Sequence, residues 1–137
     1  MGRVLALDYG EKKIGIAMSD KTRTIATAKE YIHNNPQFFD NLKKFISENE
    51  VDEIILGLPL KLNGEDSEQT IRVRNFKELL DSKLGLVSTL VDERLTTSYA
   101  EKLMISGNVR RDKRKQKIDS LSAQIFLQNY LDKCQKQ

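Results

Sequence analysis

The sequence predicts an α/β protein built on a mixed, mostly parallel five-stranded sheet with helices on both faces. Three strand-like segments come before the first helix, which indicates an antiparallel, hairpin-like start. Helix and strand patterns then alternate, which is typical of βαβ units with parallel strands. No repeat, low-complexity tract or long linker interrupts residues 1–137, so we expect a single domain.

The first three predicted strands lie near the N-terminus. Apolar runs predict strands at Arg3–Asp8 and Ile14–Ser19, and a less regular pattern predicts a third at Thr24–Ile32. The segment between the first two contains Gly10 and has a length that suits a hairpin-type loop. Pro36 then opens a helix, because apolar residues recur after it at helical spacing: Phe38, Phe39, Leu42, Phe45 and Ile46.

Alternating strands and helices follow in the middle of the chain. Glu53–Leu58 is short and apolar and predicts a buried strand. A second helix is expected from near Asp66, with Gln69 in the capping-box position, to about Leu80. The run Leu86–Val91 predicts a further buried strand that is followed directly by acids.

Two more helices are predicted towards the C-terminus. Ser98 and Glu101 form a capping box that opens a helix towards Met104. The last helix, from about Lys117 to Lys133, is apolar on much of its circumference, which is typical of a helix packed on the body of the fold.

The formal net charge of +3 is unevenly distributed along the chain. From Asn108 onward there are eight Lys and Arg against three Asp and Glu, whereas the preceding part has fifteen against seventeen. This basic C-terminal part indicates a polyanionic partner such as a nucleic acid.

Residue usage also excludes several classes of protein. Cys134 is the only cysteine and His33 the only histidine, which leaves neither a disulfide framework nor a zinc cluster. No apolar run approaches the ~20 residues of a membrane span, and the N-terminus lacks a signal-peptide pattern. We therefore expect a soluble, cytoplasmic protein with no membrane partner.

Three acids stand where the predicted topology can bring them together. Asp8 closes the first strand and Glu93 closes the last one. Ligands of open α/β sheets bind beyond the carboxyl ends of the strands, and neighbouring strands lie ~4.8 Å apart, so we expect these two carboxylates to be neighbours. Asp119 lies near the start of the last helix, where Ser122 and Ala123 on the same face are small and leave it room.

Three clustered carboxylates repel one another unless they are protonated or bind a cation. Hard oxygen ligands without a Cys/His set favour Mg²⁺ or Mn²⁺ over Zn²⁺. Such a site, with two ions, suits metal-assisted hydrolysis of phosphodiester bonds and requires no side-chain nucleophile.

Each acid also has a plain structural interpretation. Asp8 stands before Tyr-Gly and is a candidate turn residue. Glu93 is a candidate solvated loop acid, and Asp119 a helix acid that complements the dipole. The local pattern alone leaves both interpretations open.

The basic run 110–117 is a solvated loop or a phosphate-binding segment. Because it ends just before Asp119, a nucleic acid held by it would pass the expected metal site. It contains no aromatic residue, so it predicts no stacking platform for single-stranded bases. Its basic residues are Arg110, Arg111, Lys113, Arg114, Lys115 and Lys117.

The loop 57–64 has two possible roles. It is either an ordinary Gly/Pro connection from strand to helix or a lining of the substrate groove. In the second case Lys61 contacts the substrate, with Arg72 and Arg74 nearby.

Motifs along nearly the whole chain resemble the YqgF family of bacterial RNase H-like proteins. Members are described as Holliday junction resolvase-like proteins and as nucleases that mature the 5′ end of 16S ribosomal RNA. The matching segments are Asp8-Tyr-Gly-Glu-Lys-Lys-Ile-Gly-Ile-Ala, Ser19-Asp20, Gly57-Leu58-Pro59, Asp92-Glu93-Arg94-Leu95-Thr96-Thr97 with Ala100-Glu101, and Asp119 followed by Ala123, Leu127-Gln128 and Tyr130-Leu131.

The resemblance implies an RNase H-like fold in which Asp8, Glu93 and Asp119 bind the metal ions. Lys12, Lys13 and Arg94 are further candidates for contacts with phosphate. The family usually has Arg in place of Lys13 and Ala in place of Ser122, and lysine lacks the bidentate contacts of arginine. Neither departure removes an acid.

The leading functional hypothesis is a Mg²⁺- or Mn²⁺-dependent nuclease that matures the 5′ end of pre-16S rRNA. The alternatives are a resolvase-type endonuclease acting on branched DNA and a non-catalytic nucleic-acid-binding module. A homodimer would suit a four-way junction and a monomer would suit RNA trimming. The Asp-x-Gly segment also resembles the phosphate loop of actin- and hexokinase-like ATPases, but those enclose the nucleotide between two such domains.

Overall fold

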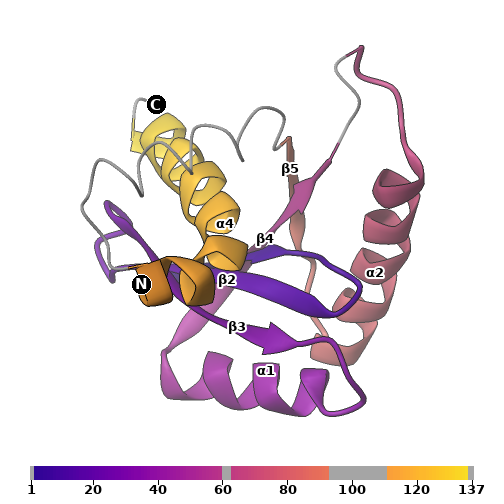
Figure 1. The fold of residues 1–137 in the computed structure, drawn as a ribbon. Helices are drawn as coiled ribbons and strands as arrows, with labels where there is room; N and C mark the ends of the chain where they lie inside the picture. Colours follow the sequence, from indigo (N-terminus) through magenta and orange to yellow (C-terminus); the bar gives the residue numbers. More distant parts are fainter. Residues whose placement is uncertain (1, 60–62, 93–110, 136–137) are drawn as a thin grey trace.

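The structure is a computed structural model that describes residues 2–59, 63–92 and 111–135, with the side chains of the last segment described from Ser120 to Cys134 (Figure 1). A five-stranded sheet has the order β3-β2-β1-β4-β5. The strands are β1 (Arg3–Asp8), β2 (Lys13–Ser19), β3 (Ala26–His33), β4 (Val51–Leu58) and β5 (Thr89–Asp92). The described helices are α1 (Phe38–Glu48), α2 (Glu68–Leu84) and α4 (Arg111–Gln135).

The sheet is mixed, as the sequence predicts. β2 pairs antiparallel with both β1 and β3, and β4 pairs parallel with both β1 and β5. β1, β3, β4 and β5 therefore run in one direction and only β2 is reversed, which confirms the expected mostly parallel sheet with an antiparallel start. The expectation that β1 and the last strand are neighbours is wrong, because β4 pairs with both and lies between them.

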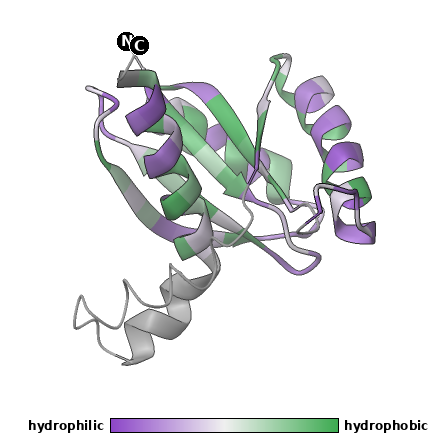
Figure 2. Cartoon of the chain, turned by 90° about the horizontal axis from the view of Figure 1, so that it is seen from above, coloured by the Kyte–Doolittle hydropathy of each residue, from purple (hydrophilic) through white to green (hydrophobic). Residues whose placement is uncertain are grey.

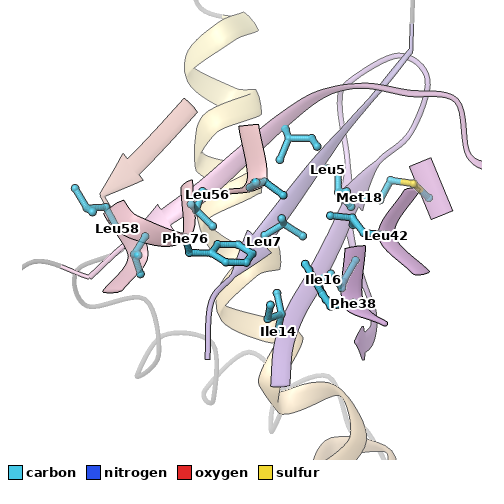
Figure 3. Packing of buried hydrophobic residues seen from close by; sticks show 13 residues of the cluster. Leu5, Leu7, Ile14, Ile16, Met18, Phe38, Leu42, Leu56, Leu58 and Phe76 are labelled. Carbon is cyan, nitrogen blue, oxygen red and sulfur yellow. The ribbon is translucent and has the colours of Figure 1, made fainter. Parts of the chain in front are cut away.

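Large apolar side chains fill the face of the sheet covered by α1 and α2. We call this buried group the α1/α2 cluster; its strand residues include Leu5, Leu7, Ile14, Ile16 and Leu56 (Figure 3). Helix residues Phe38, Leu42, Val73, Phe76 and Leu80 close the cluster from outside. Figure 2 shows hydrophobic residues concentrated along the strands, whereas much of α2 is hydrophilic on its outer side.

Helix α4 covers the opposite face, over a second buried group that we call the α4 cluster. Its strand residues are Val4, Ala6, Ala17, Ala26 and Ile55, and its helix residues are Ala123, Phe126, Leu127 and Leu131. Because side chains alternate between the faces of a strand, consecutive residues of β1 belong to different clusters.

Side chains of α4 also bond to the sheet backbone. Ile16 N–H donates to Ser120 Oγ at 3.0 Å. Ala26 N–H donates to Gln128 Oε1 at 2.9 Å, and Gln124 Nε2 donates to the Ala26 carbonyl at 3.1 Å. The two glutamines thus satisfy the outward-facing backbone groups of an edge strand, which would otherwise need water.

The N-terminal boundary of α2 differs from the prediction. Ser67 is the N-cap, and it forms a capping box with Thr70, so the predicted Asp66–Gln69 cap is wrong. The capping box has the predicted spacing of three residues, but it begins one residue later than predicted. Gly85, with a φ of 65°, ends the helix in the left-handed conformation that glycine favours.

Two other boundaries also differ. Strand β5 begins at Thr89 rather than Leu86, because Ser88 N–H and Oγ donate to Asp81 Oδ1 at 3.0 and 2.7 Å and hold the preceding turn. Helix α4 begins at Arg111, so most of the basic run is helical and the loop interpretation is wrong for 111–117. The helix expected between Ser98 and Met104 lies outside the described residues.

Of the helices in the described ranges, none combines the length and the apolar character that a membrane crossing requires.

Candidate metal and nucleic-acid site

Asp8 lies at the carboxyl end of β1, in the middle of the sheet, and is half-buried. Val4 and Ala6 belong to the α4 cluster, so strand alternation places Asp8 on the α4 side as well. Its partner in the antiparallel ladder is Gly15 of β2, which has no side chain to cover the carboxylate. A central strand therefore presents an acid to the face that α4 crosses.

The loop after Asp8 is held by several backbone contacts. Gln69 Nε2 donates to the Tyr9 carbonyl at 3.2 Å, and Asn34 Nδ2 donates to the Gly10 carbonyl at 2.9 Å. A Cβ atom at Gly10 would lie 2.4 Å from the Lys13 carbonyl oxygen, so glycine is required for this close approach. Gln69 thus fixes the loop instead of capping α2.

Asp119 belongs to α4, immediately before Ser120. The hydrogen bond from Ile16 N–H to Ser120 Oγ docks this part of the helix on β2. Ile16 follows Gly15, the ladder partner of Asp8. The backbone at Asp119 is consequently held next to the strand position opposite Asp8.

Glu93 lies outside the described residues, directly after the end of β5. Val91 packs against the α4 cluster, whereas Asp92 is exposed and alternates to the other face. Because β4 lies between β1 and β5, the ends of these two strands are about two strand spacings, or ~10 Å, apart. The carboxyl ends of β1 and β5 are therefore separated by one strand, β4, and are not direct neighbours as predicted.

The predicted phosphate-binding residues fall into three groups. Lys12 and Lys13 are exposed on the loop and at the start of β2. The second group has helical backbone in α4: Arg111, Lys113, Arg114, Lys115 and Lys117. The third lies outside the described residues: Lys61, Arg94 and Arg110.

Two arginines of α2 were expected near the substrate groove. Arg72 forms an ion pair with Glu11 of the loop after β1, so it lies beside the candidate site. Arg74 pairs with Asp66 at 3.1 Å, at the start of its own helix. The structure therefore brings Arg72, but not Arg74, to the loop.

Sequence reasoning missed Tyr31 and His33, two aromatic residues on the same side of the sheet as Asp8. The Nζ of Lys13 lies 4.7 Å from the centre of the Tyr31 ring, and the rings of Tyr31 and His33 are 5.2 Å apart. Their spacing of two residues in a strand was the available signal, because such residues share a face.

Acids at the opposite end of the sheet are engaged in structural contacts. The Gly2 N–H and the Arg23 guanidinium hold the pKa of Asp52 below its usual range. The Glu53 carboxylate, which also pairs with Arg23 at 2.7 Å, accepts a hydrogen bond from Tyr130 and raises the pKa of that phenol. These groups stabilise the fold and are not candidates for catalysis.

Within the described ranges, no group of three His, Cys, Asp or Glu side chains could by itself hold a metal ion. Of the predicted trio, only Asp8 has a described side chain. The grouping of Asp8, Glu93 and Asp119 into one metal site therefore stays a prediction.

A family model described as "RuvX: Holliday junction resolvase" matches residues 2–133. The chain belongs to the RuvX family. A relative from Dictyoglomus thermophilum is 43% identical over 132 residues, covering 95% of both chains, and is named "Putative pre-16S rRNA nuclease". A relative from Listeria monocytogenes with the same name is 40% identical over 134 residues, covering 95% of this chain and 97% of its own.

Solved structures confirm the RNase H-like fold expected for a RuvX protein. RuvC from T. thermophilus in complex with a Holliday junction substrate has a TM-score of 0.57 at 10% identity, covering 98% of this chain and 96% of RuvC. The fowlpox virus resolvase in complex with Holliday junction DNA has a TM-score of 0.51 at 12% identity, covering 96% of this chain and 98% of its own. At these identities the likeness concerns the fold.

As a RuvX family member, the chain is a nuclease, a hydrolase acting on phosphodiester bonds. Nucleases and resolvases of this family bind nucleic acid and generally use divalent metal ions. The resemblance to the YqgF family is thereby confirmed, because RuvX and YqgF denote the same family.

Proposed function

We propose that this RuvX protein hydrolyses phosphodiester bonds in pre-16S rRNA during maturation of the 5′ end, and that residues 1–137 act as one nuclease domain. Asp8, Glu93 and Asp119 bind two Mg²⁺ or Mn²⁺ ions in this proposal. The supporting observation is the contact between Ser120 and Ile16, which docks α4 on the strand position next to the partner of Asp8.

The donor set fits such ions. Asp8 supplies carboxylate oxygens from a central strand, whose backbone is fixed by pairing on both sides. Its half-buried position removes part of the competing water, and Gly15 leaves space above it. Divalent ions bound there supply an activated water and stabilisation of the leaving oxygen.

The rest of the chain contributes substrate binding. Lys12 and Lys13 stand beside Asp8, and the basic residues in the first turns of α4 precede Asp119. Contacts of lysine and arginine with phosphates give affinity and position without reading the sequence. The contacts at Gly10 fix the backbone of the loop that joins Asp8 to the two lysines.

The relatives' names support a ribosomal RNA precursor as the substrate. The family description and the fold shared with RuvC favour branched DNA as the second candidate. RNA trimming requires only a monomer, whereas symmetric cleavage of a junction requires a dimer. Light scattering of the purified protein with each substrate separates the two assemblies.

The decisive experiment compares a pre-16S rRNA fragment and a synthetic four-way junction as substrates, each with Mn²⁺. Asp8→Asn keeps the shape of the side chain but removes its charge. We expect hydrolysis to fall by roughly 10³-fold, equivalent to ~4 kcal/mol of transition-state stabilisation. Asp132→Asn, an exposed acid at the far end of α4, is the matched control and keeps full activity.

Unchanged hydrolysis by pure, folded Asp8→Asn protein would contradict the metal-site proposal. Cleavage of the junction but not of the RNA fragment would replace the proposed substrate by branched DNA. Tight binding without cleavage of either substrate, across several metals, would favour the non-catalytic binding module.

A further inference from the structure

Edge strand β3 carries two aromatic rings beside a lysine. The rings of Tyr31 and His33 are 5.2 Å apart at an angle of 89°, an edge-to-face arrangement. The Nζ of Lys13 lies 4.7 Å from the centre of the Tyr31 ring, within the range of a cation–π contact. Tyr31 is half-buried and His33 is exposed. We call these three residues the β3 platform.

The register of the sheet places the β3 platform on the α4 side. Lys13 and His33 are ladder partners, so their side chains share a face. Ile14, the next residue of β2, packs in the α1/α2 cluster, so Lys13 alternates to the other side. Asp8 lies on that same side, which puts the β3 platform and the candidate metal ligand on one surface.

The β3 platform is also close to Asp8 along the sheet. Asp8 faces Gly15 across the β1–β2 ladder. The β2–β3 ladder has a register shift at Gly15, where β3 contains an extra residue and Tyr31 lies beside it. Tyr31 is therefore about two strand spacings from Asp8, or ~10 Å, a short distance for a nucleic-acid chain.

A surface hollow between β3 and α1 borders the two rings. Its basic members are Lys29 and Lys44, and its acidic members are Glu30 and Glu48. Lys44 and Glu48 pair at 3.9 Å, and the two basic and two acidic residues balance each other. The hollow therefore has balanced charges and lies towards α1, so the binding surface is formed by the two rings and Lys13 and not by the hollow.

We propose that the β3 platform binds an unpaired nucleotide of the RNA whose neighbouring phosphodiester bond lies at Asp8. The base stacks on the exposed ring of His33, which Tyr31 supports edge to face, and Lys13 beside the two rings contacts the adjoining phosphate. This inference rests on the proposed nuclease function and deepens it, because it assigns a single-stranded segment to the substrate. Bases paired within a duplex remain stacked on each other and do not reach the rings.

Binding is tested by fluorescence anisotropy in EDTA, so that neither metal nor hydrolysis affects the result. The probes are a short single-stranded RNA and the same strand annealed to its complement. The double variant Tyr31→Ala/His33→Ala should bind the single strand about tenfold more weakly and the duplex equally well. Thr27→Ala, an exposed position on the same strand, is the matched control and leaves both affinities unchanged.

Two outcomes overturn the proposal: unchanged affinity of the double variant for the single strand, and an equal loss for both probes. Tyr31→Phe, which keeps the ring, should bind the single strand like the native protein. If the double variant does not fold, His33→Ala alone, at an exposed position, should still weaken binding of the single strand and not of the duplex. Ultraviolet crosslinking of RNA containing 5-iodouridine should label the peptide that contains Tyr31. Because EDTA removes catalysis, a failed nuclease proposal and a failed β3 platform give different results.

Discussion

The face of the sheet under α1 and α2 is filled with large apolar side chains, whereas the face under α4 contains three alanines from β1, β2 and β3. The first face lies against two helices and has the buried phenylalanines Phe38 and Phe76. The second lies against one helix, which bonds to the sheet backbone through Ser120, Gln124 and Gln128.

The two faces of the sheet therefore have different roles: one stabilises the fold and the other positions α4. Large apolar contacts supply most of the stabilisation, because the free energy of burial grows with the apolar area removed from water. Small residues and directed hydrogen bonds allow α4 to approach closely and fix its position on the strands. Asp8, Lys13 and the aromatic pair of β3 all lie on the α4 side, where position matters more than buried area.

The largest stability effect should come from the α1/α2 face. Leu7→Ala removes a fully buried side chain and should lower the free energy of unfolding by about 3 kcal/mol. The neighbouring Ala6→Leu adds volume beneath α4 and should cost about 2 kcal/mol through overpacking. Urea denaturation followed by circular dichroism measures both. A loss below ~1 kcal/mol for Leu7→Ala would remove the distinction between the faces.

Two serine substitutions on the α4 side should have a smaller effect on stability, and only one of them should also affect hydrolysis. Ser120→Ala leaves the buried Ile16 N–H without its acceptor, and Ser19→Ala does the same to Val4 N–H, whose hydrogen bond is 2.8 Å. Each substitution should cost about 1–2 kcal/mol. Only Ser120→Ala should also slow hydrolysis, by about tenfold, because only Ser120 adjoins Asp119.

The two serine variants are compared at a temperature where both are folded, and Ser120→Thr, which keeps the hydroxyl, serves as the rescue. Equal hydrolysis rates of Ser120→Ala and Ser19→Ala would show that docking at Ser120 does not position the site.

The smallest effect concerns a polar anchor on the α1/α2 side. Burial alone would raise the pKa of Asp81, but hydrogen bonds from Lys77 at 2.6 Å and from Ser88 outweigh it and lower the pKa. The resulting stabilisation is present above the unfolded pKa of ~3.9 and is lost as the pH falls through the lower folded value. Asp81→Asn should therefore cost about 1 kcal/mol near neutral pH and progressively less below about pH 4.

Urea denaturation of the native protein and Asp81→Asn at a series of pH values measures this difference. A difference that stays constant down to about pH 2 would exclude an ionised Asp81 as the anchor of the turn before β5.

The sequence allowed all five strands to be predicted, because each described strand contains a short apolar run. The strand order could not be predicted, because the residues of β4 do not indicate that this strand lies between β1 and β5. The α2 cap was displaced by one residue because Asp66/Gln69 and Ser67/Thr70 both have capping-box spacing. The start of α4 was missed because charged residues such as Lys113 and Arg114 form helices without an apolar period.

For the candidate site, the sequence correctly identified Asp8 as the acid that ends a central strand. The partnership of Asp8 with Glu93 and Asp119 stays a prediction. The spacing of Tyr31 and His33 shows only that they share a face; that this is the face of Asp8 could not be predicted, because it depends on the register shift opposite Gly15.

The hydrogen bond between Ile16 and Ser120 joins residues that are 104 positions apart. During synthesis β1, β2 and β3 leave the ribosome before α4, so their α4 side has no cover until the helix follows. Alanine exposes little apolar area, so this uncovered side of the sheet is less prone to aggregate than a face of leucines would be. If α4 completes the metal site, the nuclease stays inactive until α4 has been synthesised and has docked on the sheet.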